Sequence, residues 1–235
     1  MARRQGPPWT LERALERRAA PLREQAAEAL CRAILSMQLE EGARLIEREL
    51  VEWLRVSRTT VREALRELEA EGLVEVIPQR GPVVATISEA DAADLYAART
   101  ALEALVVRRF VERADDALVE ELADAAEAYA AVATDGHEVL DMLEIKDRFY
   151  EVLRRGANSP ALWQVLSGLQ ARVRVLRARS LAVPGWPAAS AAELRELVAA
   201  IRDRDADRAA ELCESHVRAA AATGLPALRE ARRAR

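Results

Sequence analysis

A short segment that begins at Ser57 combines side chains that hold phosphate with side chains that read base edges. Ser57, Thr59 and Thr60 carry short hydroxyl groups, and Arg58 and Arg62 lie four residues apart. On a helix, this spacing places both guanidinium groups on one face. Free backbone N–H groups at a helix N-terminus favour phosphate, and a guanidinium group can form two hydrogen bonds to guanine. The segment is therefore a candidate for contacting DNA.

Further arginines in the same region extend this pattern. Arg48 precedes the segment, and Arg80 and Gly81 form the tip of a predicted hairpin that follows it. Arg48 is placed to reach the phosphate backbone, Arg80 is placed to reach the minor groove or its phosphates, and Gly81 lets the backbone approach closely. Each arginine taken alone also fits a solvated charge paired with Glu63 or Glu67. Their combination on one face favours DNA contact.

The elements that must position these residues follow one another in the order of a winged helix-turn-helix. Apolar residues recur at helical spacing before the segment and within it, and then run as two short strands. A tight turn precedes Ser57, which can cap the helix that follows, and Gly72 can end that helix. The predicted elements are a helix over 22–37, a short strand at 44–46, helices over 47–54 and 58–71, and strands over 73–77 and 82–87.

The rest of the chain is predicted to be helical. Hydrophobic residues make up 51% and aromatic residues 4% of the sequence, so the apolar content is mostly Ala, Leu and Val, of which Ala and Leu favour helices. We expect a mainly α fold, with a three-helix winged helix-turn-helix that carries a small β-hairpin wing, followed by an antiparallel all-α bundle. The expected parts are a flexible arm (1–20), the DNA-binding domain (21–87), the helical domain (88–228) and a basic tail (229–235). Breaks between the helices of the last domain are expected at Gly136, at 156–160 and at 184–187.

Composition excludes several classes of protein. A net charge of −4 argues against a protein that coats nucleic acid indiscriminately, but it allows a positive face. Cys31 and Cys213 form no disulfide framework, and no segment resembles a signal peptide or a membrane span, so we expect a cytoplasmic protein. His137 and His216 are the two histidines, and the sequence contains no nucleophile elbow, P-loop or dinucleotide motif. An enzyme is therefore not expected.

Three motifs of the N-terminal region are Arg44-Leu-Ile-Glu-Arg-Glu-Leu50, Val56-Ser-Arg-Thr-Thr-Val-Arg-Glu-Ala-Leu-Arg66 and Glu69-Ala-Glu-Gly-Leu-Val74. Together they resemble the DNA-binding domain of GntR-family regulators over about 23–86. The resemblance implies a homodimer that binds a short pseudo-palindromic operator, more often as a repressor than as an activator. It also implies DNA contacts by Arg48, Ser57, Arg58, Thr59, Thr60, Arg62, Arg80 and Gly81.

One position departs from that family's pattern. Arg55 stands where the family usually has a glycine in the tight turn. If this residue needs a positive φ, a side chain there costs on the order of 1 kcal/mol. We therefore expect a slightly strained turn, and the alternative is a further phosphate contact by Arg55.

The C-terminal half contains Asp94-Leu-Tyr-Ala-Ala-Arg-Thr-Ala-Leu-Glu103, the segment 149–160 and the segment 206–216. These resemble the FCD domain, the helical ligand-binding domain of the FadR-like branch. Many such domains hold a divalent metal with an aspartate and three histidines. Here the aspartate position is Lys146, the first histidine position is Tyr150, the second falls near Glu193, and His216 alone remains. We therefore expect no metal and no cofactor.

The same replacements suggest a different ligand. Lys146, Tyr150 and His216, with Arg99 from the first helix of the domain, would line the vacated cavity and bind a carboxylate or phosphate directly. In the alternative arrangement, Lys146 points to solvent and pairs with a neighbouring acidic residue while Tyr150 fills the cavity.

The sequence thus favours a regulator whose operator affinity responds to a small anionic molecule, an organic acid above all. Two other functions stay open: a regulator whose helical domain only dimerises, and a winged-helix module that binds protein instead of DNA. The strong salt dependence of operator binding would separate the last of these from the others.

Overall fold

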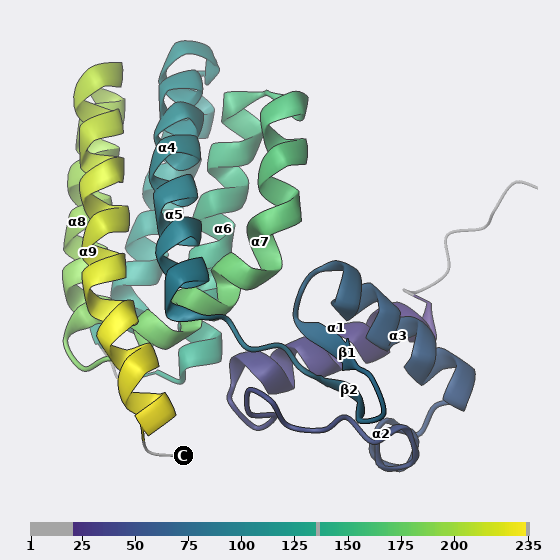
Figure 1. Cartoon of the computed structure of the whole chain (residues 1–235). Helices are drawn as coiled ribbons and strands as arrows, with labels where there is room; N and C mark the ends of the chain where they lie inside the picture. The colour runs from purple at the N-terminus through teal and green to yellow at the C-terminus, as the bar shows by residue number, and fades with distance from the viewer. Residues whose placement is uncertain (1–20, 135–136, 234–235) are drawn as a thin grey trace, which may run out of the picture.

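The computed structural model describes residues 21–134 and 137–233, so the expected arm over 1–20 lies outside the described residues. The N-terminal part contains α1 (Leu22–Leu35), α2 (Glu47–Leu54), α3 (Arg58–Ala70), β1 (Val74–Ile77) and β2 (Gly81–Val84). The C-terminal part contains α4 (Glu89–Arg113), α5 (Asp116–Thr134), α6 (Val139–Ala157), α7 (Pro160–Leu181), α8 (Trp186–Arg202) and α9 (Ala206–Arg233). Figure 1 shows the two parts as a small mixed unit beside a bundle of long helices.

The N-terminal part has the winged helix-turn-helix order that the sequence predicts. Val61, Leu65 and Leu68 of α3 are buried against Leu30 and Ile34 of α1, which accounts for the apolar stripe on both helices. Strands β1 and β2 pair antiparallel, with Val74 opposite Val84 and Ile77 opposite Gly81. The strand expected at 44–46 is a single bridge between Arg44 and Val83. The wing is therefore a two-stranded hairpin with one extra pairing.

The tight turn between α2 and α3 is left-handed at Arg55, where φ is 55° and ψ is 39°. The sequence suggested this strain, because an L-residue with a side chain is disfavoured in that region by roughly 1–2 kcal/mol. The turn ends at Ser57, whose Oγ accepts a hydrogen bond from the Thr60 N–H over 3.1 Å. This cap sets where α3 begins and therefore which residues its N-terminus presents.

The C-terminal part is an all-α bundle in which α4 packs along α9 and α6, and α5 packs between α6 and α8. Helix α4 starts at its cap Ser88, which accepts from the Asp91 N–H over 3.0 Å. The close crossing of α4 and α6 depends on Gly156, because a Cβ there would lie 2.3 Å from Cε2 of Phe110. Helix α9 continues to Arg233, so most of the segment expected as a basic tail belongs to the last helix.

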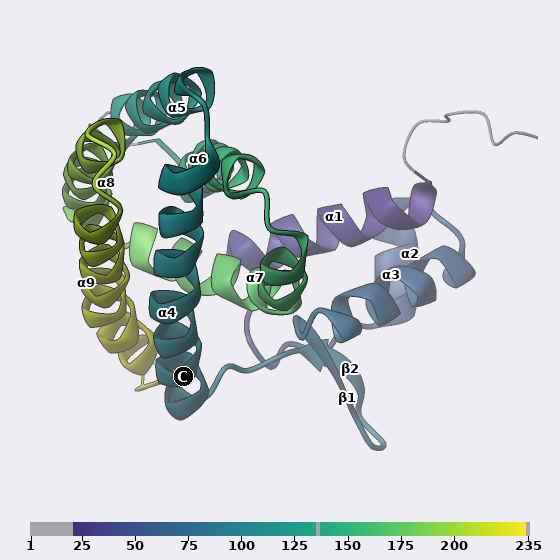
Figure 2. The ribbon, with the colours of Figure 1, turned by 90° about the horizontal axis from the view of Figure 1, so that it is seen from above.

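The two parts meet along α7. Figure 2 shows α7 next to α1, on the side of the bundle that faces the DNA-binding part. Arg179 of α7 pairs with Glu41 over 2.5 Å, and both side chains are nearly buried. Arg172 of α7 lies against Gly72, which has a φ of 75°. Through the described residues, no helix is both long and apolar enough to cross a membrane.

Candidate DNA-binding face and effector cavity

The N-terminus of α3 presents most of the residues predicted to contact DNA. Arg58, Thr59 and Arg62 are exposed, as is the capping residue Ser57. Thr60 is half-buried, and its Oγ1 lies 2.9 Å from Oγ of Ser57. One hydroxyl pair therefore serves the helix cap, while the neighbouring side chains face solvent.

Arg58 and Arg62 share one carboxylate, that of Glu47 on α2. Nε of Arg62 lies 2.8 Å from Oε1 of Glu47, and Nε of Arg58 lies 3.9 Å from Oε2. The hydrogen bond from Arg62 lowers the pKa of Glu47. Exposed ion pairs are worth about 0–1 kcal/mol, so both guanidinium groups can exchange Glu47 for a base or a phosphate at small cost. The sequence suggested Glu63 or Glu67 as partners, and the structure shows Glu47 instead.

The remaining residues of this group lie on α2 and at the wing. Arg48 is exposed on α2. Arg80 is exposed at the hairpin tip, and its Nη2 donates to the carbonyl oxygen of Gly42 over 3.1 Å. Gly81 has a φ of 85°, a conformation that favours glycine. The winged unit thus carries exposed arginines on α2, α3 and the wing.

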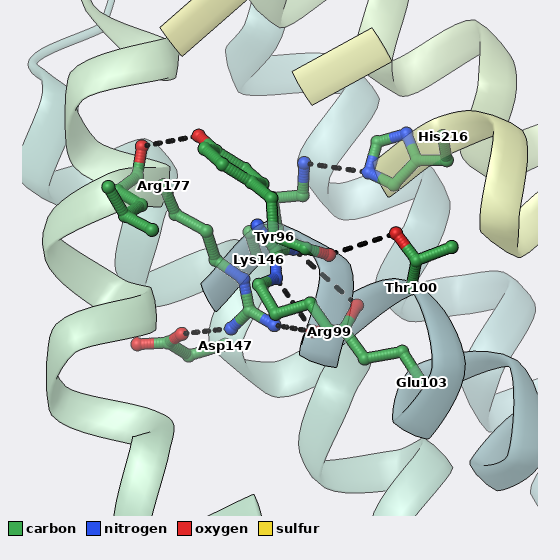
Figure 3. Close-up of polar contacts among 9 residues, drawn as sticks. Tyr96, Arg99, Thr100, Glu103, Lys146, Asp147, Arg177 and His216 are labelled. Atoms are coloured by element: carbon green, nitrogen blue, oxygen red, sulfur yellow. Dashed lines mark hydrogen bonds and ion pairs between the residues drawn. The ribbon is translucent and has the colours of Figure 1, made fainter. Parts of the chain in front are cut away.

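The bundle interior contains a polar cluster centred on Glu103, which Figure 3 shows. Nε of Arg99 lies 3.0 Å from Oε1 of Glu103, and Nη2 of Arg177 lies 3.0 Å from the same oxygen. Arg99 is 1% exposed, Arg177 5% and Glu103 8%. The guanidinium group of Arg177 also lies over the ring of Tyr150, 3.4 Å from its centroid. Burial and the nearby carboxylate of Glu103 raise the pKa of Tyr150 to about 12.

Lys146 lies in the same interior and does not point to solvent, so the alternative in which it pairs with a surface carboxylate does not hold. Its side chain is 3% exposed, and its Nζ donates to Oγ of Ser190 over 2.6 Å. Nζ also lies 3.5 Å from Nε2 of His216 and 4.9 Å from the ring centroid of Tyr129. Burial and the guanidinium groups of Arg177 and Arg99 lower the pKa of Lys146 well below its usual value.

His216 closes the cluster on the α9 side. Its Nδ1 lies 2.6 Å from Oε2 of Glu193, and its ring stacks on Trp186 with centroids 5.9 Å apart. Burial and the positive charges of Lys146 and Arg99 lower the pKa of His216. A neutral ring with its proton on Nδ1 satisfies both neighbours, because it donates to Glu193 and accepts from Lys146 at Nε2.

A metal ion does not fit these residues. Nε2 of His216 faces the amine of Lys146, and Nδ1 is engaged by Glu193. A divalent ion needs three or four ligands and no adjacent cation. Within residues 21–134 and 137–233, no group of three or more His, Cys, Asp and Glu side chains could hold a metal ion.

A small cavity of about 50 Å³ lies beside the cluster. Tyr150 and His216 line it, whereas Arg99 and Lys146 are not among its lining residues. Most of the cavity wall is apolar. Its apolar residues are Val106, Phe149, Leu153, Trp163, Leu166, Val173, Leu194 and Leu197. Its other polar residues are Glu103, Arg154, Gln170, Arg177 and Cys213.

Four members of this cluster were not predicted from the sequence as site residues: Glu103, Arg177, Ser190 and Glu193. Glu103 had a detectable signal, because it stands four residues after Arg99 and therefore on the same helix face. Arg177 had none, since it is one of several arginines on α7. Its burial follows from the packing of α7 on α4 and α9.

The fold and these two sites define a class of protein, a DNA-binding regulator in which a winged helix-turn-helix is joined to a helical bundle. The chain belongs to the GntR family of bacterial regulatory proteins, whose model matches residues 22–84, and its C-terminal part is an FCD domain, matched over residues 94–219. Proteins of this family are transcription regulators and not enzymes, and FCD domains bind small-molecule effectors and form dimers.

Individual relatives agree with this assignment. A transcriptional regulator from an unstable DNA locus of Streptomyces ambofaciens is 31% identical over 189 residues, 79% of this chain and 78% of that protein. The transcriptional repressor RspR of Escherichia coli is 27% identical over 84% of this chain and 86% of its own length. The structure of McbR/YncC from E. coli shares the fold, with a TM-score of 0.73 at 22% identity over 86% of this chain and 95% of that one. The chain is therefore a DNA-binding transcription regulator.

Proposed function

We propose that the chain is a homodimeric repressor whose affinity for a pseudo-palindromic operator is modulated by a small organic acid bound in the bundle. The observation that carries the ligand part of this proposal is a buried hydrogen-bond donor without a partner. The hydroxyl of Tyr150, which lines the cavity, has no hydrogen-bond partner, and neither has Nη1 of Arg99, whose side chain is 1% exposed and lies outside the cavity lining. Unsatisfied buried donors are costly, and a carboxylate would satisfy them.

On the DNA side, we assign base reading to Arg58 and Arg62, because they are exposed on the N-terminal half of α3. Arg48, Ser57 and Thr59 contact phosphates, with Thr60 completing the cap. Arg80 and Gly81 reach the adjacent minor groove from the wing. The relatives RspR and GlaR of E. coli are named as repressors, which supports repression here. Operator binding also supports a cytoplasmic location.

In the experiment, a DNA duplex is first selected from a random pool by its binding to the full-length protein. The same protein is then titrated against this duplex. Acetate, benzoate, succinate, citrate and inorganic phosphate are added in turn. A coupling free energy of about 1–3 kcal/mol corresponds to a change in operator Kd of roughly 5–150-fold. We expect at least one carboxylate to produce such a change. If none does and the protein still binds the operator, the bundle serves dimerisation alone.

Salt dependence tests the DNA part separately. Each phosphate contact adds about −0.9 to the slope of log K against log salt concentration. A steep slope supports DNA binding by the arginine face, and a selected duplex that binds without salt dependence would favour the protein-interaction alternative.

A further inference from the structure

Two buried arginines converge on the buried carboxylate of Glu103. It bridges Arg99 of α4 and Arg177 of α7, whose side chains are 1% and 5% exposed. Nε of Arg99 and Nη2 of Arg177 lie 3.0 Å from the same oxygen, and Nη2 of Arg99 lies 3.5 Å from the other. The chain thus supplies its own anion to the cluster.

The adjacent cavity borders the pair of Glu103 and Arg177. The cavity measures about 50 Å³, which is room for several water-sized groups. Glu103 and Arg177 both line the cavity, so an anion that entered it would meet this pair first.

Arg177 stands on the helix that also contacts the DNA-binding part. On the bundle side, Asp147 of α6 pairs with Arg174 over 2.8 Å and with Arg177 over 3.7 Å. Arg174 in turn lies close to Cys31 and Glu71 of the DNA-binding part: burial raises the pKa of both groups, and the charge of Arg174 opposes that rise. The ionic chain from Glu103 thus leads along α7 to the other domain.

Two more residues of α7 contact that domain directly. Arg179 pairs with Glu41 over 2.5 Å in a nearly buried position. The side chain of Arg172 lies against Gly72, the residue between α3 and β1, 3.1 Å from where a Cβ would stand. A shift of α7 would therefore displace the C-terminal end of α3, the helix proposed to read DNA.

We propose that Glu103 is a built-in competitor of the effector: an incoming carboxylate takes Arg177 from Glu103, and the freed α7 moves against the winged helix-turn-helix. This inference rests on the proposed function and names how its site is regulated. Glu103 is a positioning residue here, since it acts on the operator through Arg177 and α7.

The test uses full-length Glu103→Gln, which keeps the shape of the side chain and removes its charge. Acetate is the probe. Its binding is measured from the thermal unfolding midpoint of the protein as a function of acetate concentration. We expect the variant to bind acetate at least tenfold more tightly than the wild type, because the competing carboxylate is gone. Its operator Kd without acetate should differ at least fivefold from that of the wild type, in the direction in which acetate changes the wild type.

The matched control is Glu121→Gln, which removes a carboxylate from an equivalent pair on the bundle surface, with Arg155 at 2.8 and 2.7 Å. We expect it to leave acetate binding and operator Kd within twofold of the wild type. A folded Glu103→Gln protein with wild-type acetate affinity and wild-type operator Kd would overturn the proposal. Failure of the wild type to bind any selected duplex would instead overturn the proposed function.

If Glu103→Gln does not fold, Glu103→Ala keeps the question open to experiment, because truncation leaves room for a free carboxylate between the two arginines. Acetate should then raise the unfolding midpoint of Glu103→Ala more than that of the wild type or of Glu121→Ala. Equal effects of acetate on all three proteins would count against a carboxylate site at Arg99 and Arg177.

Discussion

At the residue scale, the arginines of the winged unit divide by what surrounds them. Arg58 and Arg62 are held loosely by Glu47, and Arg48 is exposed on the helix before. An exposed pair of this kind orients the guanidinium groups without holding them firmly. We therefore expect the two arginines on α3 to read bases and Arg48 to contact the phosphate backbone.

This division predicts different effects of single substitutions. Arg58→Ala or Arg62→Ala should reduce discrimination between the selected duplex and a scrambled one by about 1–3 kcal/mol, the worth of a bidentate base contact. Arg48→Ala should weaken both duplexes alike and reduce the salt slope by about 1. Fluorescence anisotropy at several salt concentrations measures both quantities. The assignment fails if Arg48→Ala alters discrimination while Arg58→Ala and Arg62→Ala leave it unchanged.

His216 gives a second prediction at this scale, for stability against pH. The folded pKa lies below the unfolded value of about 6.5, because burial and the neighbouring cations Lys146, Arg99 and Arg177 oppose protonation. Between those two values the unfolded chain binds more protons, so stability falls as pH falls below about 6.5. The carboxylate of Glu193 also faces the ring and moderates this fall without reversing it.

The measurement is urea unfolding of the wild type and of His216→Gln between pH 5 and 7.5. The variant should lose less stability across this window than the wild type, by up to about 1.4 kcal/mol for each pH unit of the window that lies between the folded and the unfolded pKa. The matched control is His137→Gln, since His137 is exposed, and its pH dependence should follow the wild type. Parallel curves for wild type and His216→Gln would contradict the prediction.

At the scale of elements, the crossing of α4 and α6 depends on the missing side chain of Gly156. Gly156 faces the ring of Phe110, and Ala114 is also within reach, 3.1 Å from the position of an added Cβ. The ring of Phe110 is fully buried, so it cannot move away without disturbing the core. The helix pair that carries Arg99 and Lys146 is therefore set by a glycine.

We predict that Gly156→Ala destabilises the protein by about 1–3 kcal/mol, the usual cost of overpacking. The control is Gly168→Ala in α7, where an added Cβ meets nothing within 4 Å. That change should be neutral or stabilising by up to about 1 kcal/mol, because alanine favours a helix over glycine. Chemical denaturation of both variants measures the difference, and equal stabilities would contradict the account.

At the scale of the whole molecule, α7 belongs to both domains. Its Arg177 faces the polar cluster, and its Arg179 faces Glu41 of the DNA-binding part. A two-state element that both sites bias is what allosteric coupling requires physically. A substitution at Glu103 should therefore change the operator Kd only while the contacts of α7 with the other domain are intact.

A double-mutant cycle tests this dependence. With Arg179→Ala in the background, the change in operator Kd caused by Glu103→Gln should fall to less than half of its value in the wild type. The control background is Arg195→Ala, which breaks a surface pair with Glu127 on α5 and leaves α7 untouched. Equal effects of Glu103→Gln in all three backgrounds would show that α7 does not transmit the change through Arg179.

Much of this protein follows from its sequence alone, because the signals are local. Ser57 caps α3, and Gly72, with a positive φ, follows the end of the same helix. Helix ends also fall at the breaks expected near 156–160 and 184–187. Caps, turns and apolar periodicity depend on residues within a few positions of one another. The winged helix-turn-helix, the helical C-terminal part and the family were accordingly within reach of the sequence.

Only the tertiary structure decided which charges are buried and with whom. Nothing local distinguishes Arg177 from Arg174 or Arg179, yet only Arg177 of these three pairs with Glu103, while Arg179 pairs with Glu41 of the second domain. Glu103, 74 positions away from Arg177, becomes its partner only when α4 and α7 pack together. The composition of the cluster is thus a property of helix packing, because burial and pairing of charges depend on distance in space.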